Sequence, residues 1–147
     1  MLWRLPVDGG TPEKITDGIS IRATISPDGK LLAFWYNDQQ QNSRWKLKVI
    51  HFDGSATFNM FEVAPTVEVN WDTPLRWTRD GKNLTYVDHR GGIDNIWGQP
   101  LEGGAPKQLT NFEDGKIFSF DWLKDGGFVT SRGVIASDVV LIKDVTR

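Results

Sequence analysis

The chain repeats one stretch of its own sequence. Leu2–Thr16 reads LWRLPVDGGTPEKIT, and 94 residues later Ile96–Thr110 reads IWGQPLEGGAPKQLT. Six of the 15 positions are identical, and four more exchange residues of one chemical class. Self-similarity at a fixed period is the signature of repeat architectures, so this pair of segments says more about the fold than any single motif does.

A second feature recurs between these segments. Asp-Gly pairs begin at Asp28, Asp80 and Asp125, each between apolar or alternating runs. Such a pair is the strongest short-range sign of a β-hairpin. The pairs are 52 and 45 residues apart, which is close to the period of about 40–50 residues that propeller blades show.

The sequence therefore predicts an all-β fold, a β-propeller arc of about three four-stranded antiparallel blades. Residues 1–18 supply the last two strands of a preceding blade, and no helix is expected because no apolar pattern of period 3.6 lasts beyond about two turns. The expected strands fall into a blade at 19–64, a blade at 72–111 and an incomplete last blade at 115–147: Ile21–Ser26, Leu31–Tyr36, Leu47–Phe52, Thr57–Val63; Pro74–Thr78, Asn83–Asp88, Asn95–Leu101, Lys107–Thr110; Ile117–Leu123, Gly127–Ser131, Val139–Lys143.

Composition excludes several classes of function. The 147 residues carry a net charge of −2 with mixed signs along the chain, so we expect no nucleic acid as a partner. No apolar run approaches the ~18 residues of a membrane-spanning helix, and the first ten residues lack the pattern of a signal peptide. The absence of cysteine excludes disulfides and thiolate metal sites.

No catalytic constellation is visible. The chain has two histidines, His51 and His89, but no Gly-x-Ser-x-Gly motif that would supply a serine nucleophile. Each histidine has an acidic residue close by in the sequence, but no third and fourth metal ligand. The turn aspartates recur in every blade, which favours a structural role in bonding the turn backbone. We therefore expect no catalytic residue, no metal and no cofactor, and a protein that is not an enzyme.

Residues that the repeat does not explain are the better candidates for binding. Tryptophans at equivalent positions (Trp3 with Trp97, Trp77 with Trp122) are expected to pack between blades. Trp35, Trp45 and Trp71 have no equivalents; ordinary packing is the interpretation we favour for them, and an anchor for a ligand at a loop rim is the alternative. In a propeller the loops between second and third strands and between blades gather on one face. We expect a protein or peptide to contact seven residues there: Tyr36, Asp38, Trp71, Asp72, His89, Arg90 and Arg132.

The motifs also resemble a known family. Ser26–Lys30 (SPDGK) followed by an apolar strand, then Ile-Trp and Gly-Gly-x-Pro-x-x-Leu-Thr in Ile96–Thr110, resembles the TolB-type repeat, also called WD40-like or PD40. Ser131–Lys143 resembles the C-terminal propeller of bacterial receptor-type serine/threonine kinases. The resemblance implies a non-catalytic binding module in a larger bacterial sensor or scaffold protein, with a periplasmic or other extracytoplasmic location. Lys48 and Arg79 depart from the repeat pattern.

Three blades do not close a ring, because propellers have about four to eight. Two solutions are open: the chain is the C-terminal part of a longer protein, or two copies close a six-bladed ring, with Thr11–Thr16 of one copy completing the last blade of the other. A function of a different class is also open. A prolyl-oligopeptidase-like serine peptidase has a gating propeller, and that parent would need an α/β-hydrolase domain.

Overall fold

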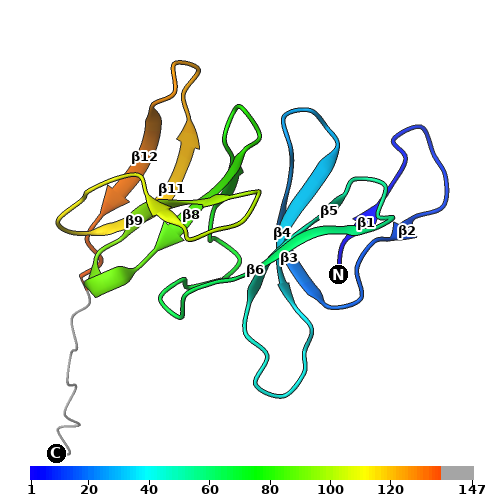
Figure 1. Cartoon of the computed structure of the whole chain (residues 1–147), viewed down its shortest axis with the longest axis horizontal. Helices are drawn as coiled ribbons and strands as arrows, with labels where there is room; N and C mark the ends of the chain where they lie inside the picture. The colour runs from blue at the N-terminus through cyan, green and yellow to red at the C-terminus, as the bar shows by residue number, and fades with distance from the viewer. Residues whose placement is uncertain (137–147) are drawn as a thin grey trace, which may run out of the picture.

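The structure is a computed structural model in which residues 1–136 are described, and within that range it is all-β with no α-helix. One four-stranded antiparallel sheet runs β3 (Ile19–Ile25), β4 (Leu31–Asn37), β5 (Lys46–His51), β6 (Thr57–Glu62). A second runs β7 (Leu75–Trp77), β8 (Asn83–Asp88), β9 (Asn95–Pro100), β10 (Lys107–Gln108). Each sheet is ordered as the chain runs, which is the meander of a propeller blade (Figure 1).

Half-blades flank the two complete blades. Before them, β1 (Trp3–Arg4) pairs with β2 (Glu13–Lys14), and after them β11 (Lys116–Trp122) pairs with β12 (Phe128–Gly133). The described chain is thus an arc of two, four, four and two strands, and the expected all-β propeller arc is confirmed. The strand expected at Val139–Lys143 lies outside the described residues. The single turn of 3-10 helix at Arg90–Gly92 was not predicted.

The strand β4 shows how the arc is held together, because both of its faces are covered. Leu32 and Phe34 face the β1–β2 half-blade, in a cluster that includes Leu2 and Ile15. Alternate side chains of a strand point to opposite faces, so Ala33 and Trp35 face the next blade, in a cluster that includes the β7 and β8 side chains.

That burial decides between the two roles that the sequence left open for two of the tryptophans. Trp35 is fully buried, and its ring lies edge-on to Tyr86 of the next blade at 5.5 Å between centroids. Trp45 also packs against this core. Neither is an exposed anchor, because the aromatic rings fill the space between the stacked sheets.

Two tryptophans at equivalent positions form equivalent bonds between blades. The indole of Trp77 donates to the carbonyl of Thr24, 3.1 Å away on the preceding blade. The indole of Trp122 donates to the hydroxyl of Thr85 at 3.2 Å, again on the preceding blade. Both tryptophans stand three residues before a turn aspartate, so the repeat carries a specific inter-blade contact as well as apolar packing, and their packing between blades is confirmed.

Trp3 behaves differently from its repeat equivalent. It is 54% exposed, whereas Trp97 is half-buried with the Arg90 guanidinium 3.7 Å from its ring centroid. The prediction that Trp3 packs between blades is wrong for the described chain. The β1–β2 hairpin has no first and second strands beside it there, so one edge and much of the indole stay open.

The aspartates of the Asp-Gly turns bond the turn backbone, as the sequence predicts. Asp28 accepts the Ser26 hydroxyl at 2.6 Å and the Lys30 N–H at 3.1 Å. Asp80 is bonded in the same way, through Thr78 and Lys82. These hydroxyl and N–H donors hold the pKa of both carboxyls below the usual range.

The described part of the chain contains no helix long and apolar enough to cross a membrane.

Candidate functional site

The strand order gives the arc two distinct ends. The three Asp-Gly hairpins gather at one end, at the top of Figure 1. The loops from β4 to β5 and from β8 to β9 lie at the opposite end, together with the segments that lead from one blade into the next. Because the hairpins are nearly identical and the opposite loops differ from one another, the loop end is where this scaffold can carry binding.

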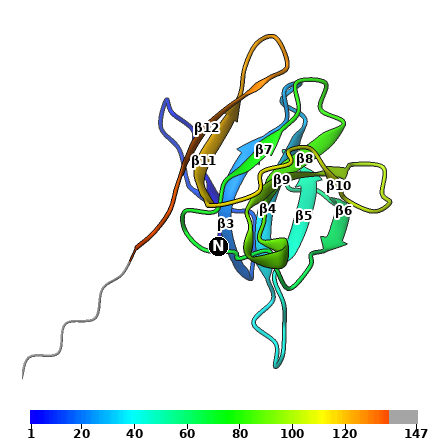
Figure 2. The same ribbon diagram turned by 90° about the vertical axis from the view of Figure 1, so that its left-hand side faces the viewer.

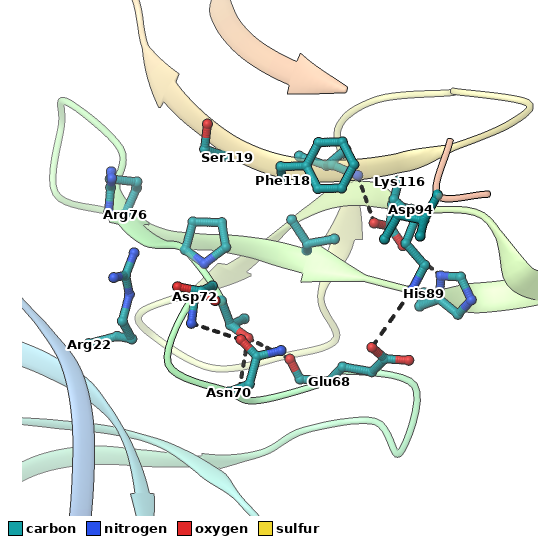
Figure 3. A pocket seen from close by; sticks show the side chains of 15 residues that line it. Arg22, Glu68, Asn70, Asp72, Arg76, His89, Asp94, Lys116, Phe118 and Ser119 are labelled. Atoms are coloured by element: carbon teal, nitrogen blue, oxygen red, sulfur yellow. Dashed lines mark hydrogen bonds and ion pairs between the residues drawn. The ribbon is translucent and has the colours of Figure 1, made fainter. Parts of the chain in front are cut away.

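A cavity of about 580 Å³ opens where the inner strands begin at this loop end. Its walls come from the segment leading into β7, the segment after β8, the start of β11 and the middle of β3 (Figure 3). Val87, Ile117 and Phe118 supply apolar surface, and charged groups surround it. The volume lies within the range of about 300–1,000 Å³ that ligand sites have, and the lining is richer in polar groups than that of most such sites.

His89 and Asp94 form a close pair of polar side chains at this cavity. The Nδ1 of His89 lies 2.6 Å from Oδ1 of Asp94. The other carboxylate oxygen accepts the backbone N–H of Ile117 at 2.7 Å. Asp94 is buried while His89 is half-buried, so the carboxylate fixes the imidazole at the cavity wall and ties the β8–β9 loop to β11. Asp94 was not among the predicted residues. Its place five residues after His89 in the same loop is the one sign in the sequence that could have pointed to it.

The segment between the two complete blades is held by its own side chains. The Thr73 hydroxyl donates to the Glu68 carbonyl at 2.6 Å and accepts the Asn70 N–H at 2.9 Å. The Asn70 side chain in turn accepts the N–H of Asp72 at 2.8 Å. These bonds stabilise a defined loop that presents Trp71, 73% exposed, beside the cavity residue Asp72.

Arg22 is a cavity residue that the sequence did not single out. It has φ of 57° in β3, where the pairing with β4 shifts between Ile21 and Thr24. A non-glycine residue in this region is uncommon and marks a bulge that redirects a side chain. Here the bulge places an exposed arginine at the cavity (Figure 3).

Two other charged side chains at the cavity form long ion pairs. Arg76 lies 3.6 Å from Asp121 on β11, and Lys116 lies 4.0 Å from Glu68. Both pairs are partly exposed, so each contributes little to stability and both remain available to a charged ligand.

The seven predicted residues do not form one cluster. Asp72 and His89 line the cavity, and Trp71 adjoins it in sequence. Asp38 lines a separate polar hollow between the β4–β5 loop and Glu62 at the end of β6.

The remaining three predicted residues make internal contacts. The Arg90 guanidinium lies 2.7 Å from Oδ2 of the buried Asp88 and covers Trp97. Arg132 stacks on Phe112 at 3.7 Å and bonds the Asp114 carbonyl. Tyr36 packs over Gly18, where a Cβ would lie 2.6 Å from its ring.

The cavity holds one pair of side chains of the kind that catalytic sites also use. Its His–Asp pair is the kind that orients a general base, but among the hydrogen bonds of residues 1–136 none joins that imidazole to a serine or threonine hydroxyl. The described residues also hold no group of three or more metal-ligating side chains.

Comparison with known proteins agrees with this architecture. No family model matches the chain. Among solved structures, TolB from Acinetobacter baumannii superposes with a TM-score of 0.67 at 22% identity, over 92% of this chain and 33% of that one. A TolB-type protein from Agrobacterium tumefaciens superposes at 0.57 with 25% identity, over 84% of this chain and 43% of that one. The chain is a propeller arc whose fold is similar to that of these TolB structures.

Two further matches set the limits of this comparison. The TolB-like arc is 27% identical over 134 residues to Atu1656, an uncharacterized protein of Agrobacterium fabrum, covering 88% of this chain and 43% of that protein. It thus spans about two fifths of the curated relative. The AtxE2 isopeptidase shares the fold over 77% of this chain and 20% of its own, at a TM-score of 0.55 and 18% identity. The likeness of Ser131–Lys143 to receptor kinases stays a prediction.

Proposed function

We propose that this TolB-like arc is a non-catalytic binding module that holds a protein or peptide over the cavity at its loop end. In this proposal the arc is the C-terminal part of a larger extracytoplasmic sensor or scaffold protein of bacteria. The observation that carries the proposal is the cavity itself, built from three successive blades at the end where their loops differ.

The surroundings of the cavity suit a peptide-like ligand. Apolar side chains, Phe118 and Ile117 among them, line the cavity together with arginine, lysine and carboxylate groups, and the exposed Trp71 precedes the lining residue Asp72 in the sequence. Aromatic anchors next to charged rims are typical of protein interfaces. A ligand with one apolar side chain and backbone or charged groups on either side would satisfy both kinds of surface.

A displayed peptide library tests this proposal. Random peptides selected on the full chain are expected to bind at least tenfold more weakly to Trp71→Ala, a change at an exposed position next to the cavity. They should bind equally well to Leu123→Ala, an exposed position at the hairpin end that is 43% accessible. Peptides that do not distinguish these two variants, or a library from which nothing is enriched, would argue against a ligand at the loop end.

A second candidate is the gating propeller of a prolyl-oligopeptidase-like serine peptidase, which the likeness to an isopeptidase favours. The DNA that flanks the coding segment separates the two candidates. A hydrolase segment with a Gly-x-Ser-x-Gly motif in the same reading frame would support the peptidase and overturn the non-catalytic proposal. A kinase domain and one membrane helix upstream would support the sensor.

A further inference from the structure

Arg22 occupies a bulge in strand β3, where that strand has one residue more than its neighbour. The pairing with β4 shifts between Ile21 and Thr24, so Arg22 and Ala23 together lie opposite one residue of β4. Arg22 has φ of 57°, and glycine is the residue that usually takes this place in a bulge, because a side chain there carries a backbone cost. The bulge takes the arginine out of the alternation of the strand and into the lining of the cavity (Figure 3).

This backbone conformation is unusual within the described chain. Residues 1–136 contain three non-glycine residues with positive φ, and the other two, Gln39 and Asn42, lie in the β4–β5 loop. Arg22 is thus the one non-glycine residue of a described strand that has it. Strained backbone persists where the surrounding structure enforces it, and it is concentrated at positions that bind ligands. The strain therefore points to a use for the Arg22 side chain in the cavity.

The charges of the cavity leave Arg22 available to a ligand. Asp94 uses both of its carboxylate oxygens on neighbouring groups, and Arg76 and Lys116 each face a carboxylate within 4.0 Å. No ion pair formed within residues 1–136 includes Arg22, and Figure 3 draws no bond from its guanidinium to the other lining residues. Asp72 also lines the cavity and has no ion pair within the described range.

We propose that Arg22 binds a carboxylate of the peptide, so that the cavity selects a segment with an acidic group close to an apolar side chain. This inference rests on the proposed function, because it names the class of peptide that the same cavity takes. The guanidinium is a planar fork whose N–H donors match the two oxygens of a carboxylate. Ile117 and Phe118 of β11 line the same cavity and supply the surface for the apolar side chain.

The carboxylates of the cavity limit the negative charge that a ligand can carry. Glu68, Asp72 and Asp94 all belong to the lining, and like charges brought together at a binding site oppose binding. A phosphate group carries about 1.5–2 negative charges at pH 7, so these residues repel it more strongly than they repel a carboxylate. The cavity therefore favours a single carboxylate, which either an acidic side chain or the C-terminus of a peptide provides.

Peptide libraries that differ at one fixed position test the proposal on the full chain. That position is glutamate, glutamine or lysine beside a fixed leucine, all other positions are random, and the peptides have free C-termini. The glutamate library should be enriched on the wild-type chain and the lysine library should not. Its binders should lose at least about tenfold in affinity on Arg22→Gln. They should keep their affinity on Lys30→Gln, which makes the same change of charge at an exposed position of the hairpin end.

Amidation of the selected peptides identifies the source of the carboxylate. Glutamate binders that tolerate an amidated C-terminus present the side chain to Arg22. If the glutamate and glutamine libraries are enriched equally and amidation abolishes binding, Arg22 holds the C-terminal carboxylate.

Asp72→Asn tests the sign of the charge that the cavity selects. Removing this carboxylate should strengthen the acidic binders by about two- to fivefold, because one negative charge of the lining is lost. If the cavity instead selected a cation, Asp72→Asn would weaken the binders and Arg22→Gln would not. That pattern would overturn the proposal.

A stability measurement separates binding from a structural role of the arginine. Glycine adopts positive φ without a steric cost, so Arg22→Gly should have an unchanged or higher thermal midpoint, yet it should bind acidic peptides as weakly as Arg22→Gln does. A clearly lower midpoint would mean that the arginine serves the fold, and unchanged peptide affinity would mean that it does not touch the ligand. Either result contradicts the proposal.

The libraries also separate this inference from the proposed function. Binders that are enriched equally from all three libraries, tolerate amidation and still require Trp71 would overturn the selection of an acid and leave the peptide site standing. Libraries from which nothing is enriched would overturn both.

Discussion

Replacing Trp77 by phenylalanine removes one hydrogen bond from the junction of two blades and keeps the aromatic ring. Trp77 is 7% exposed, and its indole donates to the Thr24 carbonyl. The Thr24 carbonyl keeps its place in the β3–β4 ladder opposite Ala33, so the loss is that of one hydrogen bond, a net contribution of about 0.5–1.5 kcal/mol. The smaller ring also leaves a void in the inter-blade core, which adds about 1 kcal/mol. The free energy of unfolding should therefore fall by about 1.5–2.5 kcal/mol, a sizeable part of the ~5–15 kcal/mol of an ordinary domain.

Urea unfolding followed by far-ultraviolet circular dichroism measures this change. The chain concentration must be held constant, because association between copies would make the midpoint depend on it. Trp71→Phe is the matched control: that side chain is 73% exposed, and its loss should change the free energy of unfolding by less than about 0.5 kcal/mol. If the two variants were destabilised equally, the repeated indole bond would have no role in joining the blades.

Three further changes test other parts of the structure. Burial, helped by the charge of nearby Asp88, raises the pKa of Tyr86 to about 12, so neutral Tyr86 stabilises the fold below about pH 10. Unfolding free energy should fall by up to about 3 kcal/mol as the pH rises from 10 to 12, a dependence that Tyr86→Phe should remove in urea titrations at each pH. The hydrogen bond from the Ser26 hydroxyl lowers the pKa of Asp28, so the contribution of the Asp28 carboxylate to stability is present above about pH 4 and is lost as the pH falls through the folded pKa. Asp28→Ala should lower the thermal midpoint at pH 7 more than Asp28→Asn does. Equal midpoints would contradict the role of Asp28 in the turn. Gly18→Ala would bring a Cβ to 2.6 Å from the Tyr36 ring and should cost about 1–3 kcal/mol in urea unfolding, whereas Gly127→Ala, with contacts of 3.5 Å, should be nearly neutral.

The strands and hairpins could be predicted because their determinants are local. An Asp-Gly pair sets its own turn, as the bonds of Asp28 and Asp80 show, and alternation sets which side chains of β4 face each neighbour. Long-range packing was harder to foresee. Trp35 stands near a strand end, where ordinary packing and a place at a loop rim were both open, and only the sheet stacked on it, which buries the ring completely, decides between them.

The candidate site was only partly predictable for a related reason. Asp72 and His89 stand in loops, and a rule about which loops share an end was enough to find them. Arg22 reaches the cavity because of a bulge in β3. The sequence around Arg22 has no feature that predicts the position of this bulge. Asp94 matters because it bonds the N–H of Ile117, 23 residues away, and such a partner is set by the packing of two blades.

The scaffold and the cavity use the same strands at different positions, which separates stability from recognition. Three residues before each of the last two turn aspartates stands a tryptophan that bonds the preceding blade. Six residues before each of the three turn aspartates the chain has Arg22, Pro74 and Ser119, and all three line the cavity. Equivalent backbone positions thus carry unlike side chains where the inner strands meet the cavity, so recognition can diverge there without weakening the blade junctions.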